Sequence, residues 1–323
     1  MQTIGIINKK GTCERGGREA GKVYHPYLHD LYELAKTITV TAKLVKDLVI
    51  PRSATSRKGD NGIVLVVGGS RIYHGAPILA SIAALRSGTD LVFTAVPRSN
   101  IIAVRAYSPD IIALPLPDDK LTVGLVNRLM AMLPKKPHTA AIGMGMGIAK
   151  PEALVSLIRQ LRNAEIKLLL DASALIPEIL REISGTGTIV TPHVGEYKRL
   201  FEKHPGTSEE VQTSTVQTVA KDYGITIVLK GSVNIISDGV SQQTAVIKRS
   251  TPAMTVGGMG DILSGLTAGL LTKYNSLNAS ILGVYLNGVA ASLAYKRVGL
   301  HMLASDVIED LPKAMKPFDL IKT

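Results

Sequence analysis

The stretch TPAMTVGGMGDILSGLTAGLL, residues 251–271, decides the fold. Three glycines and Asp261 stand directly before a run with helical apolar spacing. Glycines weaken helices and strands, so a cluster marks a turn or a place where another group approaches the main chain closely. A helix that begins here presents unpaired N–H groups and the positive end of its dipole. The stretch therefore predicts a glycine-lined cup for an anion such as a phosphoryl group.

Asp261 is the candidate catalytic base of this cup. A carboxylate beside an anion-binding turn repels phosphate, so its useful task is to accept a proton from a hydroxyl group that attacks the phosphoryl group. An aspartate at a helix start can also serve only as an N-cap. The catalytic role is favoured because the glycine cup, the acid and the helix occur together.

Short β-branched runs alternate with helical patterns from about residue 61 onward. Near-continuous hydrophobic strands between helices are typical of a parallel sheet covered on both faces, so the predicted fold class is α/β with a mostly parallel central sheet. In such sheets, ligands bind at the carboxyl ends of the strands. Strands are expected over 62–69, 90–97, 139–145, 166–173, 187–193, 225–232 and 233–239, the last two as an antiparallel pair, and helices over 76–88 and 195–203.

Several candidate ligand-contacting segments directly follow the expected strands. The loop GGSRIYHGAP (68–77) and the turn GMGMG (143–147) allow close approach of a ligand, although a strand-to-helix turn needs glycine in any case. His193 is expected at the ligand edge, where a structural role is an equal alternative. Lys230 beside Gly231 suits phosphate contact, with a surface lysine as the common alternative.

Composition limits the function classes. The chain has 323 residues, one cysteine (Cys13) and a net charge of +11, with 11 Lys/Arg against 6 Asp/Glu in the first 60 residues. A single cysteine excludes an internal disulfide framework and fits a reducing compartment. The expected absence of both a signal-peptide core and an apolar run of membrane-spanning length predicts a cytoplasmic protein without a membrane partner. The basic charge could attract nucleic acid, but no nucleic-acid-binding motif accompanies it, so such a partner is not expected.

Residues 1–50 differ from the remainder and are interpreted as an N-terminal extension to a domain over 51–323. The extension is expected to pack on the domain or to be partly disordered at its start. The spacing LHDLYELAKTITVTAKLVKDLVI predicts one helix over 28–50.

Taken together, the motifs resemble the ribokinase-like superfamily and, within it, the ADP- or ATP-dependent NAD(P)H-hydrate dehydratases. The resemblance spans about residues 50–315. It rests on six motifs in order: RKGD (57–60), GGSRIYHGAP (68–77), IGMGMG (142–147), TPHVGE (191–196), LKGSVN (229–234) and GGMGDILSG (257–265). It implies a ribokinase-like three-layer α/β/α fold and repair of NADH or NADPH that has gained water across a nicotinamide double bond.

The resemblance also implies roles for particular residues. Asp261 would be the base and Gly258, Met259 and Gly260 the anion hole, with Gly260 also near the nucleotide phosphates. The adenine nucleotide would contact Lys230, Gly231, Ser232, Val233 and Asn234. The hydrated dinucleotide would contact Ala76, Gly145, Gly147, His193 and Asp261. ADP or ATP would be the co-substrate and Mg²⁺ the cofactor, and the implied assembly is a homotetramer.

Some residues depart from the family pattern. Met259 stands where threonine is common, which removes one hydroxyl donor, and Met144, Val194 and Arg57 also differ. These departures leave the choice between ADP and ATP open. The alternative enzyme is a small-molecule kinase of the same superfamily acting on a vitamin precursor or a sugar, and a remote alternative is a non-catalytic nucleic-acid-binding protein.

Overall fold

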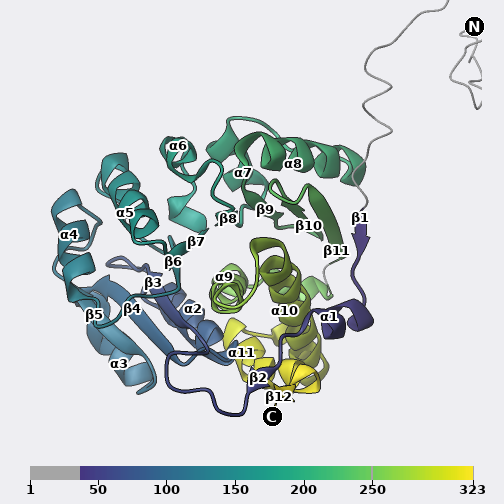
Figure 1. Cartoon of the computed structure of the whole chain (residues 1–323), viewed down its shortest axis with the longest axis horizontal. Helices are drawn as coiled ribbons and strands as arrows, with labels where there is room; N and C mark the ends of the chain where they lie inside the picture. The colour runs from purple at the N-terminus through teal and green to yellow at the C-terminus, as the bar shows by residue number, and fades with distance from the viewer. Residues whose placement is uncertain (1–36, 249, 323) are drawn as a thin grey trace, which may run out of the picture. The chain divides into compact units, whose positions relative to one another are not determined.

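A ten-stranded sheet is the centre of the described part of the chain, which comprises residues 37–248 and 250–322 of a computed structural model (Figure 1). The strand order is β1-β11-β10-β9-β8-β7-β6-β3-β4-β5, and among these strands β10 alone runs antiparallel to its neighbours. The strands are β1 (Thr37–Thr39), β3 (Ile63–Val67), β4 (Leu91–Pro97), β5 (Ile112–Leu116), β6 (Thr139–Ile142), β7 (Lys167–Leu170), β8 (Ile189–Val190), β9 (Thr226–Leu229), β10 (Val233–Asp238) and β11 (Gln243–Lys248).

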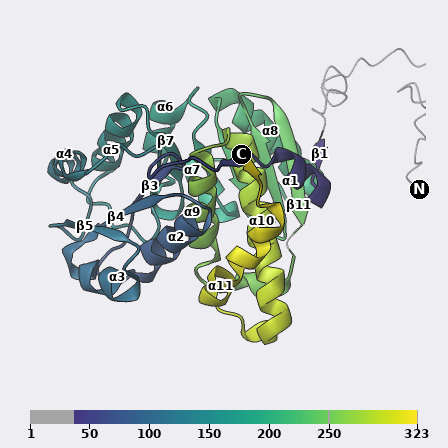
Figure 2. The same cartoon turned by 60° about the horizontal axis from the view of Figure 1, so that its bottom comes forward.

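Helices cover both faces of the sheet, because successive strand side chains point to opposite sides. Val64 and Val66 face one hydrophobic cluster, while Leu65 and Val67 face the other. The first face carries α2 (Gly75–Arg86), α9 (Met259–Leu271), α10 (Ser276–Val298) and α11 (Ala304–Met315), which lie side by side in Figure 2. The second face carries α4 (Val123–Met132), α5 (Pro151–Asn163), α6 (Leu180–Ile183), α7 (Val194–Phe201) and α8 (Glu209–Tyr223). The predicted α/β/α layers are confirmed.

Three further elements complete the described structure. Helix α3 (Ile101–Tyr107) lies beside β5, and α1 (Ala42–Leu48) contacts α10. A separate two-stranded sheet joins β2 (Arg52–Ser53) to β12 (Ile321–Lys322), so the chain segment before β3 is tied to the segment after α11.

The order of the strands reverses at β3, which pairs with β4 on one side and with β6 on the other. Chain loops leave the sheet in opposite directions at such a point and open a crevice at the carboxyl ends of the strands. We call this place, between the loops that follow β3 and β6, the switch crevice.

All seven strands expected from the sequence are present, and so are the two expected helices, as α2 and α7. The antiparallel pairing of β9 with β10 is also confirmed. Strands β5 and β11 were not predicted. Pro115 interrupts the apolar run of β5, and β11 has polar residues at both ends of the sequence QTAVIK, so neither gives a clear strand signal.

In the described residues, the single helix predicted over 28–50 is confirmed only over α1, and the residues before it form a strand. Residues 37–39 form β1, which pairs with β11 at the edge of the sheet. Helix α1 begins only after Thr41, whose side chain accepts a hydrogen bond from the Leu44 N–H. The alternating Thr-Ile-Thr-Val-Thr run explains the strand, since β-branched residues favour extended structure. Residues 28–36 and Cys13 lie outside the described residues, and the division at residue 50 stays a prediction.

The expectation that no segment reaches membrane-spanning length also needs correction. Residues Ser276–His301, which include α10, are long and apolar enough by length and composition alone. However, 67% of the most apolar window is buried inside the structure, where α10 packs on α9 and α11. A helix that is apolar on most sides and buried in this way is what a large protein core contains.

Candidate active site

Helix α9 begins in the glycine cup that the sequence predicts. Gly258 is its N-cap and has a φ of +96°, a left-handed conformation that favours glycine. A Cβ on Gly258 would lie 2.7 Å from Leu79 Cδ1 and 2.8 Å from the Cβ of Ala304, so there is also no space for a side chain. Met259, Gly260 and Asp261 follow at the first three helical positions, where backbone N–H groups have no partner within the helix.

Asp261 is therefore not the N-cap of α9, because Gly258 takes that position and makes no side-chain capping bond. Burial, together with the nearby charges of Asp171 and Glu196, raises the pKa of Asp261 to about 7, and the charge of Lys230 opposes this shift. A carboxyl group with a pKa near neutrality is suited to take up and release a proton.

Lys230 pairs with the acidic side chains that surround Asp261. Its Nζ lies 2.7 Å from Asp171 Oδ1 and 3.6 Å from Glu196 Oε2. Asp171 is 2% exposed, and its second oxygen accepts a hydrogen bond of 2.8 Å from the Ser264 hydroxyl. Burial lowers the pKa of Lys230, but the charges of Asp171, Glu196 and Asp261 outweigh it, so the pKa is raised above its usual value. Lys230 stays charged and partly neutralises three carboxylates.

His193 starts α7 and is held by a reciprocal capping arrangement. Its Nδ1 accepts hydrogen bonds from the N–H groups of Gly195 and Glu196, and its own backbone N–H donates to Glu196 Oε2. Nδ1 is thus an acceptor, which leaves Nε2 as the nitrogen that can carry a proton. His193 and Lys230 are also partners in a parallel β-bridge, so the segments after β8 and β9 lie side by side.

The two loops of the switch crevice are bonded to each other. The Gly69 N–H donates to the Met144 carbonyl oxygen, and the Gly147 N–H donates to the Gly69 carbonyl oxygen. A Cβ on Gly145, whose φ is +63°, would lie 2.7 Å from the Cβ of Tyr73 and 3.2 Å from that of Ala76. The predicted substrate contacts Ala76, Gly145 and Gly147 therefore come from one tightly packed surface.

The predicted nucleotide-contacting residues lie in the turn between β9 and β10 and at the start of β10. Gly231 and Ser232 are exposed, and the Gly231 N–H donates to the side-chain oxygen of Asn234 at 3.4 Å. Asn234 also lines a cavity of about 160 Å³ beside the segment that leads into α9. The other lining residues are Ile247, Lys248, Ser250, Met254, Val284, Tyr285, Gly288, Val289 and Ser292.

Within residues 37–248 and 250–322, no group of three or more His, Cys, Asp or Glu side chains is placed to hold a metal ion. Mg²⁺ commonly binds through one or two carboxylates together with substrate phosphates and water. The carboxylate of Asp261 fits that limited role, whereas Asp171 is bonded to Lys230 and Ser264, and Glu196 accepts from the His193 N–H.

The sequence predicted some of the residues that surround Asp261 in the structure and missed others. Asp261, Lys230 and His193 were identified. Asp171 lies near the end of the strand expected over 166–173, and Glu196 lies three residues after the strand expected over 187–193, yet neither received a role, and neither did Ser264. Only the structure shows that Asp171 turns back toward Lys230, since sequence position does not give the direction of a side chain.

Comparison with known proteins adds to this geometry. A family model described as NAD(P)H-hydrate dehydratase matches residues 64–313. The ADP-dependent (S)-NAD(P)H-hydrate dehydratase of Nitrosopumilus maritimus is 50% identical over 284 residues, which are 88% of this chain and 98% of that protein. The bifunctional NAD(P)H-hydrate repair enzyme Nnr of Pyrobaculum aerophilum is 41% identical over 83% of this chain but only 53% of that protein.

A solved structure agrees with the sequence relatives. It is that of the ADP/ATP-dependent NAD(P)H-hydrate dehydratase from Bacillus subtilis, co-crystallized with ATP/Mg²⁺. The match has a TM-score of 0.75 and 25% identity, and it covers 86% of this chain and 98% of that one.

Proposed function

Because the chain belongs to the NAD(P)H-hydrate dehydratase family, we propose that it catalyses ADP-dependent dehydration of (S)-NADH or (S)-NADPH hydrate. The hydroxyl oxygen of the hydrate attacks the terminal phosphoryl group of ADP, and AMP leaves. The phosphate then departs from the ring carbon with the electrons of the C–O bond. Loss of a proton from the adjacent carbon restores the ring double bond.

The observation that carries this proposal is the position of Asp261 at the open end of α9. Asp261 lies in the first turn, where N–H groups have no helical partners, and its pKa of about 7 lets its carboxylate accept the hydroxyl proton near neutral pH. The same N–H groups and the helix dipole stabilise the charge that develops on the phosphoryl oxygens. Base and anion hole are thus supplied by three consecutive residues, Met259 to Asp261, after Gly258.

The cavity beside Asn234 is the proposed binding site for the adenine nucleotide. Its walls combine apolar side chains such as Ile247, Met254 and Val284 with polar groups, which suits a flat heterocycle. Because Gly231 has no side chain, the nucleotide phosphates can approach the main chain there, between the cavity and the glycine cup at the start of α9. ADP is the proposed donor because the relative that is 50% identical is named as ADP-dependent. Mg²⁺ arrives with the nucleotide and supplies charge neutralisation on its phosphates.

The hydrated dinucleotide is proposed to lie in the switch crevice. Ala76, Gly145 and Gly147 supply a surface without long side chains, and His193 offers Nε2 at the adjacent edge. Asp261 then reaches the hydroxyl group from the start of α9.

The test follows recovery of reduced-nicotinamide absorbance when the protein meets hydrated NADH, Mg²⁺ and ADP or ATP. Recovery should require nucleotide and be faster with ADP. Asp261→Asn should lower the rate by about 10² to 10⁴, the usual contribution of a positioned acid or base. Asp222→Asn, an exposed change on α8, is the matched control and should leave the rate unchanged.

Two results would count against the proposal. Full activity in Asp261→Asn would remove that residue from the chemistry. A stable phosphate ester formed on a vitamin precursor or sugar, with no recovery of NADH, would favour the small-molecule kinase instead.

The apolar face around α2 and α3 supports assembly into a homotetramer. Ile102 is 78% exposed, and Ile72 and Tyr73 are also exposed. A neighbouring surface hollow is lined by His74, Gly75, Ile78, Leu79, Ala103, Ala106 and Tyr107. Apolar patches of this kind mark interfaces. Sedimentation should show a tetramer at micromolar concentration and smaller species for Ile102→Lys, and a monomer alone would contradict the proposed assembly.

The proposed location is the cytoplasm, whose reducing conditions suit a chain with one cysteine. Detection of the native protein mainly in a membrane or secreted fraction would contradict it.

A further inference from the structure

A second cavity, of about 140 Å³, lies at the end of α9 remote from Asp261. Leu270, in its wall, follows Asp261 by nine residues, which corresponds to about 14 Å along a helix axis. The remaining walls come from the segment around α1 and β2, from α10 and from the segment after α11. Many of these residues precede residue 64 or follow residue 313, so this cavity lies partly outside the segment that the family model matches.

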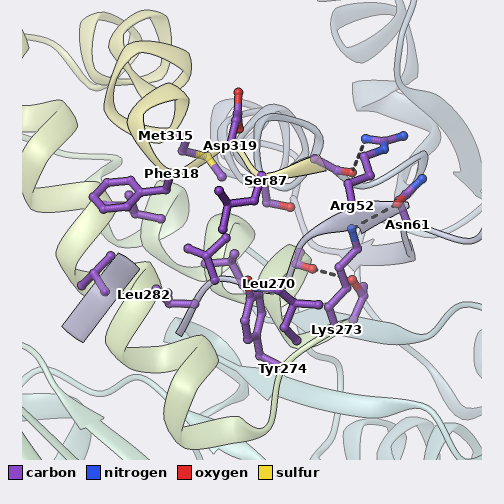
Figure 3. A pocket seen from close by; sticks show the side chains of 18 residues that line it. Arg52, Asn61, Ser87, Leu270, Lys273, Tyr274, Leu282, Met315, Phe318 and Asp319 are labelled. Atoms are coloured by element: carbon purple, nitrogen blue, oxygen red, sulfur yellow. Dashed lines mark hydrogen bonds between the residues drawn. The ribbon is translucent and has the colours of Figure 1, made fainter. Parts of the chain in front are cut away.

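The cavity has an apolar side and a basic side, as Figure 3 shows. Leu270, Leu282, Met315 and Phe318 lie on the apolar side. Arg52, Asn61 and Lys273 lie together on the other. The exposed Asp319 also lines the cavity, but its carboxylate points away from Lys273.

On the basic side, Arg52 and Lys273 bring two positive charges, and the neighbouring carboxylate of Asp90 supplies one negative charge. Arg52 Nη2 pairs with Asp90 Oδ1 at 3.1 Å, and Asp90 is further occupied by the N–H groups of Gly59 and Asn61. Lys273 Nζ donates to a neutral acceptor, Asn61 Oδ1, at 3.1 Å. Burial and the charge of Arg52 lower the pKa of Lys273, and the charge of Asp90 opposes them only in part. An ammonium group has three donors, so it can also bond an anion.

We propose that this cavity binds a small organic anion with a hydrocarbon tail. Its carboxylate lies against Lys273, with Arg52 adding attraction, and its tail lies among Leu270, Leu282 and Phe318. A charge-assisted hydrogen bond fixes the head group, and burial of the tail adds affinity. This assignment is independent of the dehydratase reaction, because it uses neither Asp261 nor the nucleotide turn.

The test titrates octanoate into the full chain by calorimetry. Saturable binding is expected in the presence of saturating ADP as well as without it. Lys273→Met should weaken binding by about tenfold or more, since it removes the charged donor but keeps an apolar stem. Octanol, with the same tail and no charge, should bind more weakly than octanoate. Lys221→Met, an exposed change on α8, is the matched control and should bind as the unmodified chain does.

Leu282→Phe provides a second variant, which narrows the tail site without changing charge; circular dichroism checks that it folds. It should also weaken octanoate binding. The proposal is overturned if octanoate binding does not saturate at millimolar concentration, or if Lys273→Met binds octanoate as well as the unmodified chain does. It is also overturned if ADP displaces octanoate, because displacement would place octanoate at the catalytic site.

Discussion

Asp261 sets the pH dependence that we expect of the reaction. Its pKa is about 7, and the base must be deprotonated to accept the hydroxyl proton. The ratio kcat/KM should therefore rise about tenfold per pH unit below pH 7 and level off above it. A pH–rate profile of the free enzyme checks this. A flat profile between pH 5 and 8 would be incompatible with Asp261 as the base.

Lys230 is expected to tune this profile because its positive charge lowers the pKa of Asp261. Lys230→Met should move the rise in kcat/KM to higher pH. The same change leaves the buried Asp171 without its partner, which typically costs about 3–5 kcal/mol of stability. The pH profile separates the two effects, since lost stability alone lowers the amount of active protein without moving the midpoint. Lys221→Met serves as the control.

The protonation of Asp261 also affects the free energy of unfolding. Its folded pKa is raised above the ordinary 3.8, so between about pH 4 and 7 the folded state binds more protons than the unfolded state. Its contribution to stability is full below this window and is lost as the pH rises through it. Asp261→Asn should therefore stabilise the protein at pH 8 by up to a few kcal/mol, at about 1.4 kcal/mol per pKa unit. Urea unfolding of both proteins at pH 5 and pH 8 measures the difference in free energy of unfolding. A stabilisation by Asp261→Asn that is larger at pH 5 than at pH 8 would contradict the prediction.

At the scale of elements, α9 is held in place by its close contact with α2. A Cβ on Gly265 would lie 1.9 Å from the Ala80 carbonyl oxygen, and one on Gly269 would lie 2.0 Å from Ser87 Oγ. Gly265→Ala should therefore separate the helices and cost about 1–3 kcal/mol in urea unfolding, as overpacking does. Gly124→Ala on α4 is the matched control, because nothing lies within 4 Å of its added Cβ. It should stabilise by about 0.5–1 kcal/mol, and equal effects at both sites would contradict the packing argument.

The elements that could be predicted from sequence are those with one dominant local signal. Strand β3 is a continuous β-branched run, and α9 follows a glycine cluster, so both were located correctly. Residues 37–39 form a strand where a helix was predicted, because apolar spacing and β-branched alternation compete there and pairing with β11 decides the outcome. The family was predicted from six motifs and is confirmed. The contacts of Asp171 and the cavity at Lys273 could not be predicted, because they join segments far apart in the chain.

At the scale of the whole molecule, the site draws on distant parts of one compact unit. The described residues belong to a single unit, and the proposed site residues range from Ala76 through His193 and Lys230 to Asp261. A ligand that contacts several of these segments binds the folded state and not the unfolded chain. Its binding energy is therefore added to the stability of the unit as a whole.

Mg²⁺ and ADP at a hundredfold excess over the dissociation constant should accordingly stabilise the fold by about 2.7 kcal/mol. For a unit of this size the melting temperature should rise by roughly 4–5 °C in a single transition. Asn234→Ala should reduce the shift, since Asn234 both accepts from the Gly231 N–H and lines the cavity proposed for the nucleotide. Lys273→Met should keep it, because Lys273 lies at the other end of α9. An ADP-induced shift lost in Lys273→Met but kept in Asn234→Ala would mean that the nucleotide binds in the remote cavity.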